Sequence, residues 1–282
     1  MAKNAKQAIR IMFLNLCGGQ WFDELMAYLK EQKSRIDVFC FQENLDTPAE
    51  GVMWSTGAPG LQRADLHRRL QELLAGEFYY PFMSSFSRVS TDKPVPLYIA
   101  NTIFVRRERS LVHPRASGEY MVFRKRDSLQ GEDVTTLARS LQWVELEFKG
   151  GGGLTVFNFH GLWNGKYGKK DFPMRLEQFK RVRDIIVLRH SGPIILGGDF
   201  NTFPESRGSR ILEEAGFKNL VQQYSIPCTR SSNYARPHNG LHADNVFVRG
   251  IPIAQFEVPQ HVAASDHLPL IVEVHIAPST SR

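Results

Sequence analysis

Apolar runs that are rich in branched and aromatic residues recur along the whole chain. Each run has the length of a strand. Most runs are apolar at consecutive positions, whereas a strand with one face in water would alternate apolar and polar residues. Polar or glycine-containing segments separate the runs, as is typical of turns. The pattern predicts strands at Ile9–Leu16, Ile36–Gln42, Ile99–Val105, Leu141–Phe148, Leu154–Phe159, Pro193–Gly197, Asn245–Val248 and Leu270–Ile276.

Four segments between these runs have the spacing of apolar residues that is typical of helices. The third is the clearest, because Asp171 and Pro173 provide start signals and Phe179, Val182 and Ile186 fall on one face. The helices are expected at Trp21–Gln32, Leu61–Ala75, Met174–Arg189 and Ser206–Ala215.

Strands interleaved with a few helices favour two packed sheets with helices outside, an α/β sandwich. Gly150–Gly153 is typical of a hairpin connection and Gly57–Gly60 of a loop, so neither is expected to link domains. One domain over residues 1–282 is therefore predicted. The most polar stretch, Arg106–Arg139, is either a surface insertion that contacts substrate or a solvated loop.

Composition fits a globular protein, with 42% hydrophobic and 23% charged residues. The net charge of +6 and the pI near 9.3 suit a polyanionic substrate, although a solvated basic surface would give the same balance. No apolar run approaches the roughly 18 to 20 residues that cross a bilayer. No secretory signal is evident either, so a cytoplasmic protein is expected.

The three cysteines, Cys17, Cys40 and Cys228, are odd in number and widely spaced. They are therefore interpreted as buried thiols in a reducing compartment and not as a disulfide framework. A mature secreted protein would look the same at its N-terminus, so the cytoplasmic assignment has this alternative.

The segment with the most chemical content is Gly197-Gly198-Asp199-Phe200-Asn201, which follows a buried strand. Sites form at strand ends in α/β proteins. The carboxylate of Asp199 can orient a water, and the amide of Asn201 can donate a hydrogen bond to phosphate. Taken alone, the pair is also typical of an ordinary turn.

Other strand ends deliver side chains of the same kind, which favours one convergent site. Asn15, Glu43 and His160 each follow an apolar run, and Asp266-His267 precedes another. In their order, these motifs resemble the endonuclease/exonuclease/phosphatase superfamily: strand-Asn, Gln-Glu, strand-His, Gly-Asp-Phe-Asn, Asp before a hydrophobic strand, and Ser-Asp-His. The resemblance runs from Asn15 to His267 and implies a four-layered αββα sandwich.

Members of that superfamily cut DNA or RNA, dephosphorylate inositol phospholipids or cleave sphingomyelin. By the resemblance, Glu43 is expected to be the principal metal ligand, with Asn15 and Asp266 beside it. Their oxygen ligands suit Mg²⁺ or Mn²⁺, and the absence of clustered cysteines argues against zinc.

The resemblance also assigns catalytic roles. Asp244 is expected to orient His267, because a carboxylate on one ring nitrogen fixes the tautomer and raises the basicity of the other. A water held by Asp199 would attack the phosphate in line, and Asn201, His160 and His267 would stabilise the new charge. Whether Asp199 or His267 takes the proton stays open. Abasic-site nucleases lack a histidine at the position of His160, which argues against that branch.

The segment Gly161–Lys170 does not match the signatures of deadenylases, tyrosyl-DNA phosphodiesterases or sphingomyelinases. Its basic and aromatic residues suit phosphate binding and base stacking, although Trp163 and Tyr167 could equally anchor the loop. The candidates for substrate binding are Lys166, Lys169, Lys170 and Trp163.

The function expected first is a nuclease acting on DNA or RNA, as a monomer. The alternative is a phosphatase or a phospholipid or inositol phosphate phosphodiesterase of the same superfamily. A non-catalytic binding protein is the third reading, and it is disfavoured because none of the expected metal or histidine positions has been lost.

Overall fold

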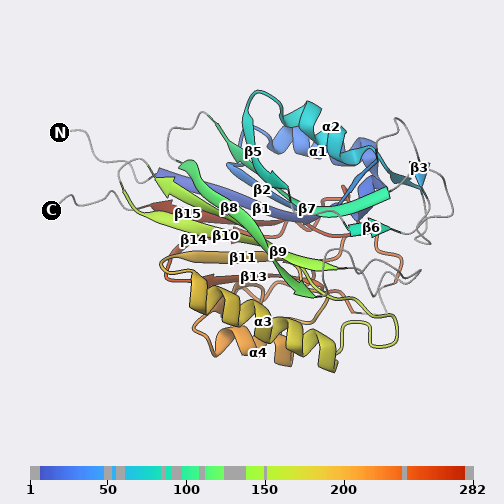
Figure 1. The fold of residues 1–282 in the computed structure, drawn as a ribbon. Coiled ribbons are helices and arrows are strands. Elements are labelled where there is room, and N and C mark those ends of the chain that lie inside the picture. Colours follow the sequence, from blue (N-terminus) through green and yellow to red (C-terminus); the bar gives the residue numbers. More distant parts are fainter. Residues whose placement is uncertain are drawn as a thin grey trace.

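A computed structural model of the protein describes residues 7–47, 53–54, 61–83, 87–89, 97–107, 112–123, 138–148, 151–236 and 240–276. Two mixed β-sheets form its centre, and the strands of one face those of the other (Figure 1). A separate two-stranded sheet joins β3 (Met53–Trp54) to β4 (Gln62–Arg63).

The first sheet contains both the earliest and the last strands of the chain, because β1 pairs antiparallel with β15 and parallel with β2. In spatial order its strands are β14 (Ile253–Glu257), β15 (Leu270–Ile276), β1 (Gln7–Asn15), β2 (Val38–Asp46), β7 (Leu97–Arg106) and β5 (Phe78–Met83), and β6 (Ser87–Val89) also pairs with β7.

The second sheet is built from the middle of the chain. In spatial order its strands are β12 (Lys218–Asn219), β13 (Asp244–Arg249), β11 (Ile194–Asp199), β10 (Gly153–His160), β9 (Arg139–Phe148) and β8 (Val112–Phe123). The pair β10–β11 is parallel, and the neighbours on either side are antiparallel. The first sheet has the same arrangement around β1–β2. The two sheets therefore share a pairing pattern, although no repeat is visible in the sequence.

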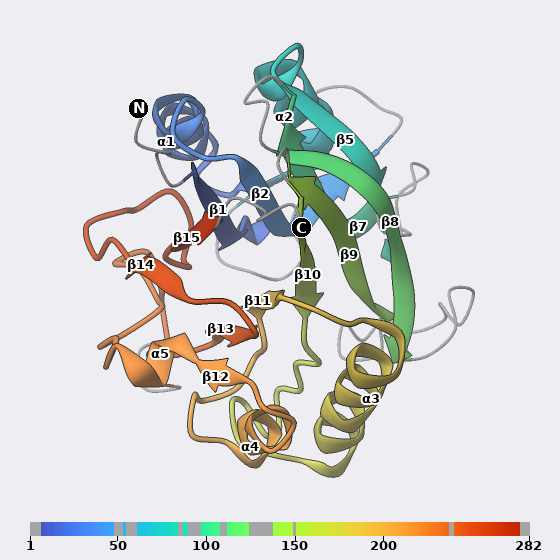
Figure 2. The ribbon, with the colours of Figure 1, turned by 90° about the vertical axis from the view of Figure 1, so that its left-hand side faces the viewer.

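Helices cover the outer face of each sheet, which gives the four layers expected from the sequence (Figures 1 and 2). The helices α1 (Phe22–Gln32) and α2 (Leu66–Leu74) lie against the first sheet, and α3 (Pro173–Arg189) and α4 (Arg207–Glu213) lie against the second. The elements η1 (Cys17–Gly19) and α5 (Leu220–Gln223) are short helical turns. The predicted αββα sandwich is thus confirmed.

The core between the sheets is tightly packed where the two central strand pairs meet. Phe13 of β1 lies against Gly197 of β11, and a Cβ added at Gly197 would come within 2.7 Å of the Phe13 ring. Any side chain at this position would push the sheets apart. A second cluster, which includes Phe159, Phe179 and Phe200, packs the second sheet against α3.

The predicted strands and helices are all present, with shifts at their ends. The largest shift is at α2, which begins at Leu66 and not at Leu61, because Gln62 and Arg63 form β4. Gly151 and Gly152 adopt positive φ in the predicted connection between β9 and β10. The loop Gly57–Gly60 lies outside the described residues. That the chain forms one domain stays a prediction.

The interpretation of Arg106–Arg139 as a loop or insertion is wrong in part, since β8 occupies residues 112–123 of it. Arg106 is also buried and bonds the carbonyl of Ile36 beside Asp37. That is the start of β2, the end remote from Glu43, so Arg106 does not face the predicted site. Arg109 and residues 124–126 lie outside the described part of the chain.

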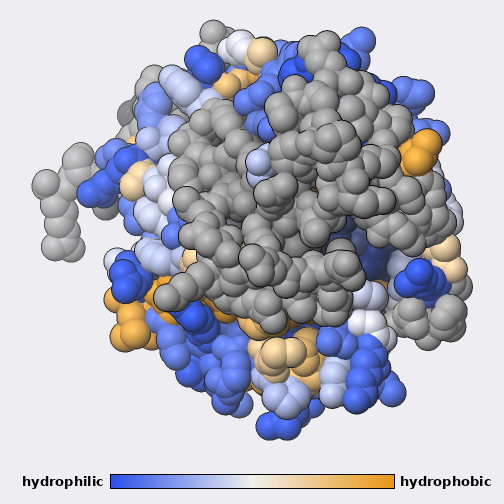
Figure 3. Space-filling model, turned by 45° about the vertical axis from the view of Figure 1, so that its right-hand side comes forward, coloured by the Kyte–Doolittle hydropathy of each residue, from blue (hydrophilic) through white to orange (hydrophobic). Residues whose placement is uncertain are grey.

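The three cysteines are free thiols, of which Cys40 is buried and the other two are half-buried. No helix in the described ranges combines the length and the apolar character that a bilayer-spanning segment requires. On the face shown in Figure 3, hydrophilic residues dominate the coloured surface, and hydrophobic residues form small separate groups. The compartment stays a prediction.

Candidate active site

The predicted site residues meet at equivalent ends of the two central parallel pairs. Asn15 is the last residue of β1 and pairs in register with Gln42, the residue before Glu43. His160 is the last residue of β10 and pairs with Asp199, the last residue of β11. Each sheet therefore contributes two of the predicted side chains. Asn15, His160 and Asp199 end their strands, whereas Glu43 lies within β2, directly after the last residue that pairs with β1.

The backbone of two site residues lies in the left-handed region that L-residues seldom adopt. Glu43 has φ 52° and Asn201 has φ 54°. At Glu43 the register between β2 and β7 shifts between Phe41 and Asn44, so a bulge re-aims this side chain. Such backbone costs on the order of 1–3 kcal/mol each and persists where the surroundings enforce it. The surrounding fold therefore holds both residues in a backbone conformation that they would not prefer on their own.

Asp199 is the centre of the site, with 2% of its surface exposed. Its Oδ1 accepts a hydrogen bond from the backbone N–H of Asn201 at 2.8 Å, and its Oδ2 accepts one from Asn15 Nδ2 at 3.0 Å. Two histidines approach the same Oδ2, His160 Nε2 at 3.8 Å and His267 Nε2 at 3.7 Å. Burial acts to raise the pKa of Asp199, but the surrounding cations lower it below its usual range, so it is ionised.

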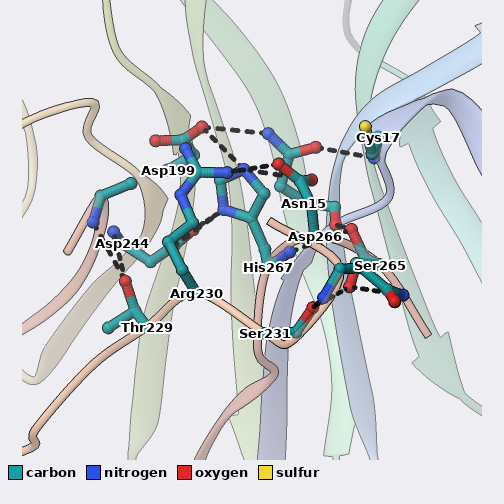
Figure 4. A network of polar contacts seen from close by, with 12 residues as sticks. Asn15, Cys17, Asp199, Thr229, Arg230, Ser231, Asp244, Ser265, Asp266 and His267 are labelled. Atoms are coloured by element: carbon teal, nitrogen blue, oxygen red, sulfur yellow. Dashed lines mark hydrogen bonds and ion pairs between the residues drawn. The ribbon is translucent and has the colours of Figure 1, made fainter. Parts of the chain in front are cut away.

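His267 forms the predicted pair with Asp244 (Figure 4). Its Nδ1 lies 2.8 Å and 2.9 Å from the two carboxylate oxygens, so Nδ1 carries a proton and Nε2 faces Asp199. Burial and Arg230 act to lower the pKa of His267. The neighbouring carboxylates of Asp244, Asp266 and Asp199 outweigh them, and the pKa is raised.

His160 has the opposite surroundings. Arg139 Nη1 lies 3.4 Å from its Nδ1, and because arginine only donates, Nδ1 accepts and Nε2 carries the proton. Nε2 lies 3.7 Å from Glu43 Oε1. Burial and the charge of Arg139 hold the pKa of His160 well below its ordinary value, so this imidazole is neutral.

The predicted metal ligands offer an oxygen-rich donor set. The Glu43 side chain is partly exposed, at 27%. Its partial removal from bulk water raises its pKa. A bound cation would counteract this rise. Asp266 Oδ2 accepts from Arg230, whereas its buried Oδ1 accepts no hydrogen bond from the described residues. A carboxylate oxygen left free in this way fits a hard divalent cation.

Asn15 does not present its oxygen to the other two predicted ligands. Its Oδ1 accepts from the backbone N–H of Cys17 at 2.9 Å, and its Nδ2 donates to Glu43 Oε1 at 3.1 Å. Ligation through Oδ1 would require the amide to turn over. A second candidate trio consists of Glu43, His160 and Asp199, whose ligand atoms lie within 4.8 Å of one another.

Of the predicted substrate-binding residues, only Lys169 reaches this site. Its Nζ donates to Asn201 Oδ1 at 2.9 Å, whereas Lys166 and Lys170 are exposed. Trp163 packs within the same loop, 3.2 Å from where a Cβ on Gly165 would lie. Tyr167 stacks on Phe172 at 5.0 Å. The two aromatic residues thus anchor the loop.

Two buried arginines in the site were not expected from the sequence. Arg139 begins β9 beside His160, and Arg230 donates to Asp266 Oδ2 at 2.7 Å and also contacts His267 Nε2 (Figure 4). Arg230 comes from a segment with no strand or helix pattern, and Arg139 ended a polar stretch. Their positions depend on tertiary folding, which leaves no local signal.

Comparisons with known proteins agree with this arrangement. A profile of the Endonuclease/Exonuclease/phosphatase family matches residues 12–267. A UPF0294 protein of Vibrio vulnificus (strain YJ016) is 33% identical over 145 residues, which is 51% of this chain and 47% of the relative. The match therefore covers about half the length of this curated relative.

Three solved structures are similar over nearly the whole chain. An endonuclease/exonuclease/phosphatase family protein from Bacteroides thetaiotaomicron has a TM-score of 0.67 at 19% identity, covering 97% of this chain and 99% of that one. A mannosyl-6-phosphatase from the same species gives 0.66 at 18%, covering 95% and 100%. D. rerio TDP2 complexed with a single-strand DNA product gives 0.61 at 15%, covering 95% and 98%. At these identities the likeness concerns the fold.

Proposed function

The chain belongs to the endonuclease/exonuclease/phosphatase family, and we propose that it is a divalent-metal-dependent phosphodiester hydrolase that acts on DNA or RNA. The endonucleases, exonucleases and phosphatases that give the family its name all hydrolyse phosphate esters, which agrees with the enzyme class expected from the sequence.

One observation carries the proposal: the Nε2 atoms of two histidines lie at similar distances from one oxygen of Asp199. His267 Nε2 and His160 Nε2 lie 3.7 Å and 3.8 Å from Asp199 Oδ2. A buried, ionised carboxylate flanked by two imidazoles whose pKa values are shifted in opposite directions suits a reaction that builds negative charge on a phosphate. A merely structural aspartate would not need both.

Glu43 and Asp266 would hold the divalent cation, Mg²⁺ or Mn²⁺, with Asn15 beside them. When bound, such an ion supplies Lewis-acid polarisation of a phosphate oxygen. The chain's own residues supply the rest. Asn15 Nδ2 bonds both Glu43 and Asp199, and so fixes the distance between the carboxylate for the metal and the carboxylate for the water.

The two sides of Asp199 then have separate tasks. The ionised Asp199 is the group that orients the attacking water and accepts its proton, while the neighbouring carboxylates raise the pKa of His267 and so favour positive charge on that side of Asp199. The Nε2–H of His160, and His267 in its protonated form, stabilise the charge that develops on the phosphate. Asn201 has its Nδ2 near Gly161 O, at 3.3 Å, and keeps a second N–H for a phosphate oxygen.

A polynucleotide is the proposed substrate because the chain carries a surplus of +6, and the D. rerio protein with this fold is complexed with a DNA product. A second candidate is a phosphomonoester. Arg139, Lys169 and Arg230 are all buried in or beside the site, and a terminal phosphate has more charge to match them.

A substrate panel tests the proposal. The purified protein with Mg²⁺ or Mn²⁺ should hydrolyse single- or double-stranded DNA or RNA with a higher kcat/KM than a sugar phosphate or an inositol phosphate. Rates on the polynucleotide should fall steeply with salt. If no polynucleotide is cut while a phosphomonoester turns over well, the second candidate replaces the first.

A further inference from the structure

The loop between β10 and α3 is held by an arginine that is completely buried. Arg175, in the first turn of α3, has 0% of its surface exposed. Its Nε and Nη2 donate to Leu162 O at 3.1 and 2.9 Å, Nη2 also donates to Gly168 O at 2.9 Å, and Nη1 donates to Lys170 O at 2.7 Å. The guanidinium therefore binds both ends of the loop at once.

Further bonds hold the same loop to its neighbours. Gln178 Oε1 accepts from the backbone N–H of Leu162 at 2.9 Å, and Thr202 Oγ1 donates to Lys169 O at 3.2 Å. The backbone of Lys169 is thus fixed on both sides. A loop with this many buried bonds is a preorganised support for the side chain that it directs inward.

That side chain is the lysine with 4% exposure, Lys169. Its Nζ donates to Asn201 Oδ1 at 2.9 Å, and among the residues that the structure describes it forms no ion pair. Burial lowers the pKa of Lys169 to about 7. Asp199 and Asp244 attract the ammonium without forming an ion pair with it, and burying an ammonium with only an amide oxygen as direct partner is unfavourable, so the arrangement suits an anion in direct contact with it.

We propose that the Lys169 ammonium binds the substrate phosphate beside Asn201, and that Arg175 is the positioning residue that holds Lys169 in place. This inference rests on the proposed function, because it concerns the same site. An ammonium has three donors, and Asn201 Oδ1 uses one of them. The other two are free to donate to phosphate oxygens, where charge-assisted bonds are strongest.

Equilibrium binding of inorganic phosphate, measured by calorimetry with Mg²⁺ present, tests the first part without requiring turnover. Lys169→Met should weaken phosphate binding by about tenfold to a hundredfold, the usual range for a hydrogen bond to a charged group. Lys169→Arg should recover part of the loss. Lys30→Met, which removes an exposed charge on α1, is the matched control and should bind as the wild type does.

Two outcomes would overturn the assignment: wild-type phosphate affinity in Lys169→Met, or no saturable phosphate binding by the wild type. If Lys169 acted only by orienting the Asn201 amide, Lys169→Met would cost nothing further in an Asn201→Ala background. Direct contact with phosphate predicts a further loss there. Phosphate binding that depends on Lys169 in a protein that cuts no polynucleotide would leave this inference standing and remove the proposed function.

The role of Arg175 is tested by a double-mutant cycle. Arg175→Lys keeps the positive charge but loses the planar guanidinium that bonds several carbonyl oxygens at once. Phosphate affinity should therefore fall while Asp199 and both histidines stay in place. In the Lys169→Met background the same change should cost nothing more. Gln178→Leu, which removes the bond to Leu162, provides a second variant if Arg175→Lys does not fold. Unchanged affinity in the folded variants, or simple additivity, would show that Arg175 does not position Lys169.

Discussion

His160, at the end of β10, and His267, in the segment before β15, face the same oxygen of Asp199, yet their surroundings are opposite. Both Nε2 atoms lie within 3.8 Å of Asp199 Oδ2. The group at Nδ1 is the carboxylate of Asp244 for His267 and the guanidinium of Arg139 for His160, and Arg230 also contacts His267 at Nε2. The carboxylates of Asp244, Asp266 and Asp199 together raise the pKa of His267, whereas burial and the charge of Arg139 lower that of His160.

The comparison shows that two imidazoles beside one carboxylate can have their pKa values shifted in opposite directions when the groups around them differ in charge. The first partner of an imidazole fixes the tautomer, and the partner's charge decides the protonation state. Proximity to Asp199 alone would have given the two histidines similar roles. Substitutions around Asp199 and at the Nδ1 partners should therefore affect the His160 side and the His267 side of the site to different extents.

The largest effect is expected from Glu43, whose Oε1 lies 3.7 Å from His160 Nε2. Glu43→Gln should abolish hydrolysis, a loss of at least about a thousandfold, because the principal proposed ligand for the cation loses its charge. Excess chelator should do the same to the wild type, and Mg²⁺ or Mn²⁺ should restore it. Full turnover in chelator, or an active Glu43→Gln enzyme with an unchanged circular dichroism spectrum, contradicts the metal assignment.

The next largest effect is expected from the His267 side. His267→Ala should lower kcat by about 10²–10³, the range for removing one group that stabilises charge in the transition state. Asp244 acts through this imidazole, so adding Asp244→Asn to His267→Ala should cost little more. Steady-state kinetics of the two single variants and the double variant measure the coupling. Rate losses that simply multiply would count against a unit formed by these two residues.

The His160 side should be more tolerant. His160→Gln keeps a donor in the site and is expected to lower kcat by about tenfold, since a neutral donor contributes less to a charged phosphate than an imidazolium does. Arg139→Gln removes the cation at Nδ1 and should have a smaller effect still. If His160→Gln were as damaging as His267→Ala, the difference in charge between the two sides would not matter for the reaction.

The smallest effect expected is on pH titration in the metal-free protein. By NMR, the His160 ring should stay neutral at acidic pH well below its ordinary pKa, and the His267 ring should stay protonated above it. The contribution of His267 to stability is present below its unfolded pKa and is lost as pH rises through the folded value. His160 has the opposite sign and destabilises the fold as pH falls through the unfolded value. Identical titration midpoints would remove the basis of the comparison.

The fold and much of the site could be predicted because both depend on strand ends. Asn15, Glu43, His160 and Asp199 each end an apolar run, and such runs are the clearest signal in a sequence. The edge strand β8 was missed because most of its residues are only half-buried or exposed, so it has no apolar period.

The rest of the site depends on contacts between distant segments. Arg230 and Asp266 are 36 positions apart in the sequence, and Arg139 and His160 are 21 positions apart. Contacts over such separations cannot be predicted from the local sequence pattern. Lys169 was picked out together with two neighbouring lysines, but only the fold of its loop turns it inward. The orientation of the Asn15 amide is likewise set by its three hydrogen-bond partners.

The close approach of Phe13 to Gly197 has a consequence for heating. Asn15 and Glu43 belong to one sheet, and His160 and Asp199 belong to the other, so their spacing is only as constant as the packing between the sheets. When that packing loosens, the reacting groups separate even while each sheet keeps its own hydrogen bonds. Inactivation should therefore begin at the temperature at which the two sheets part, ahead of any loss of strand signal.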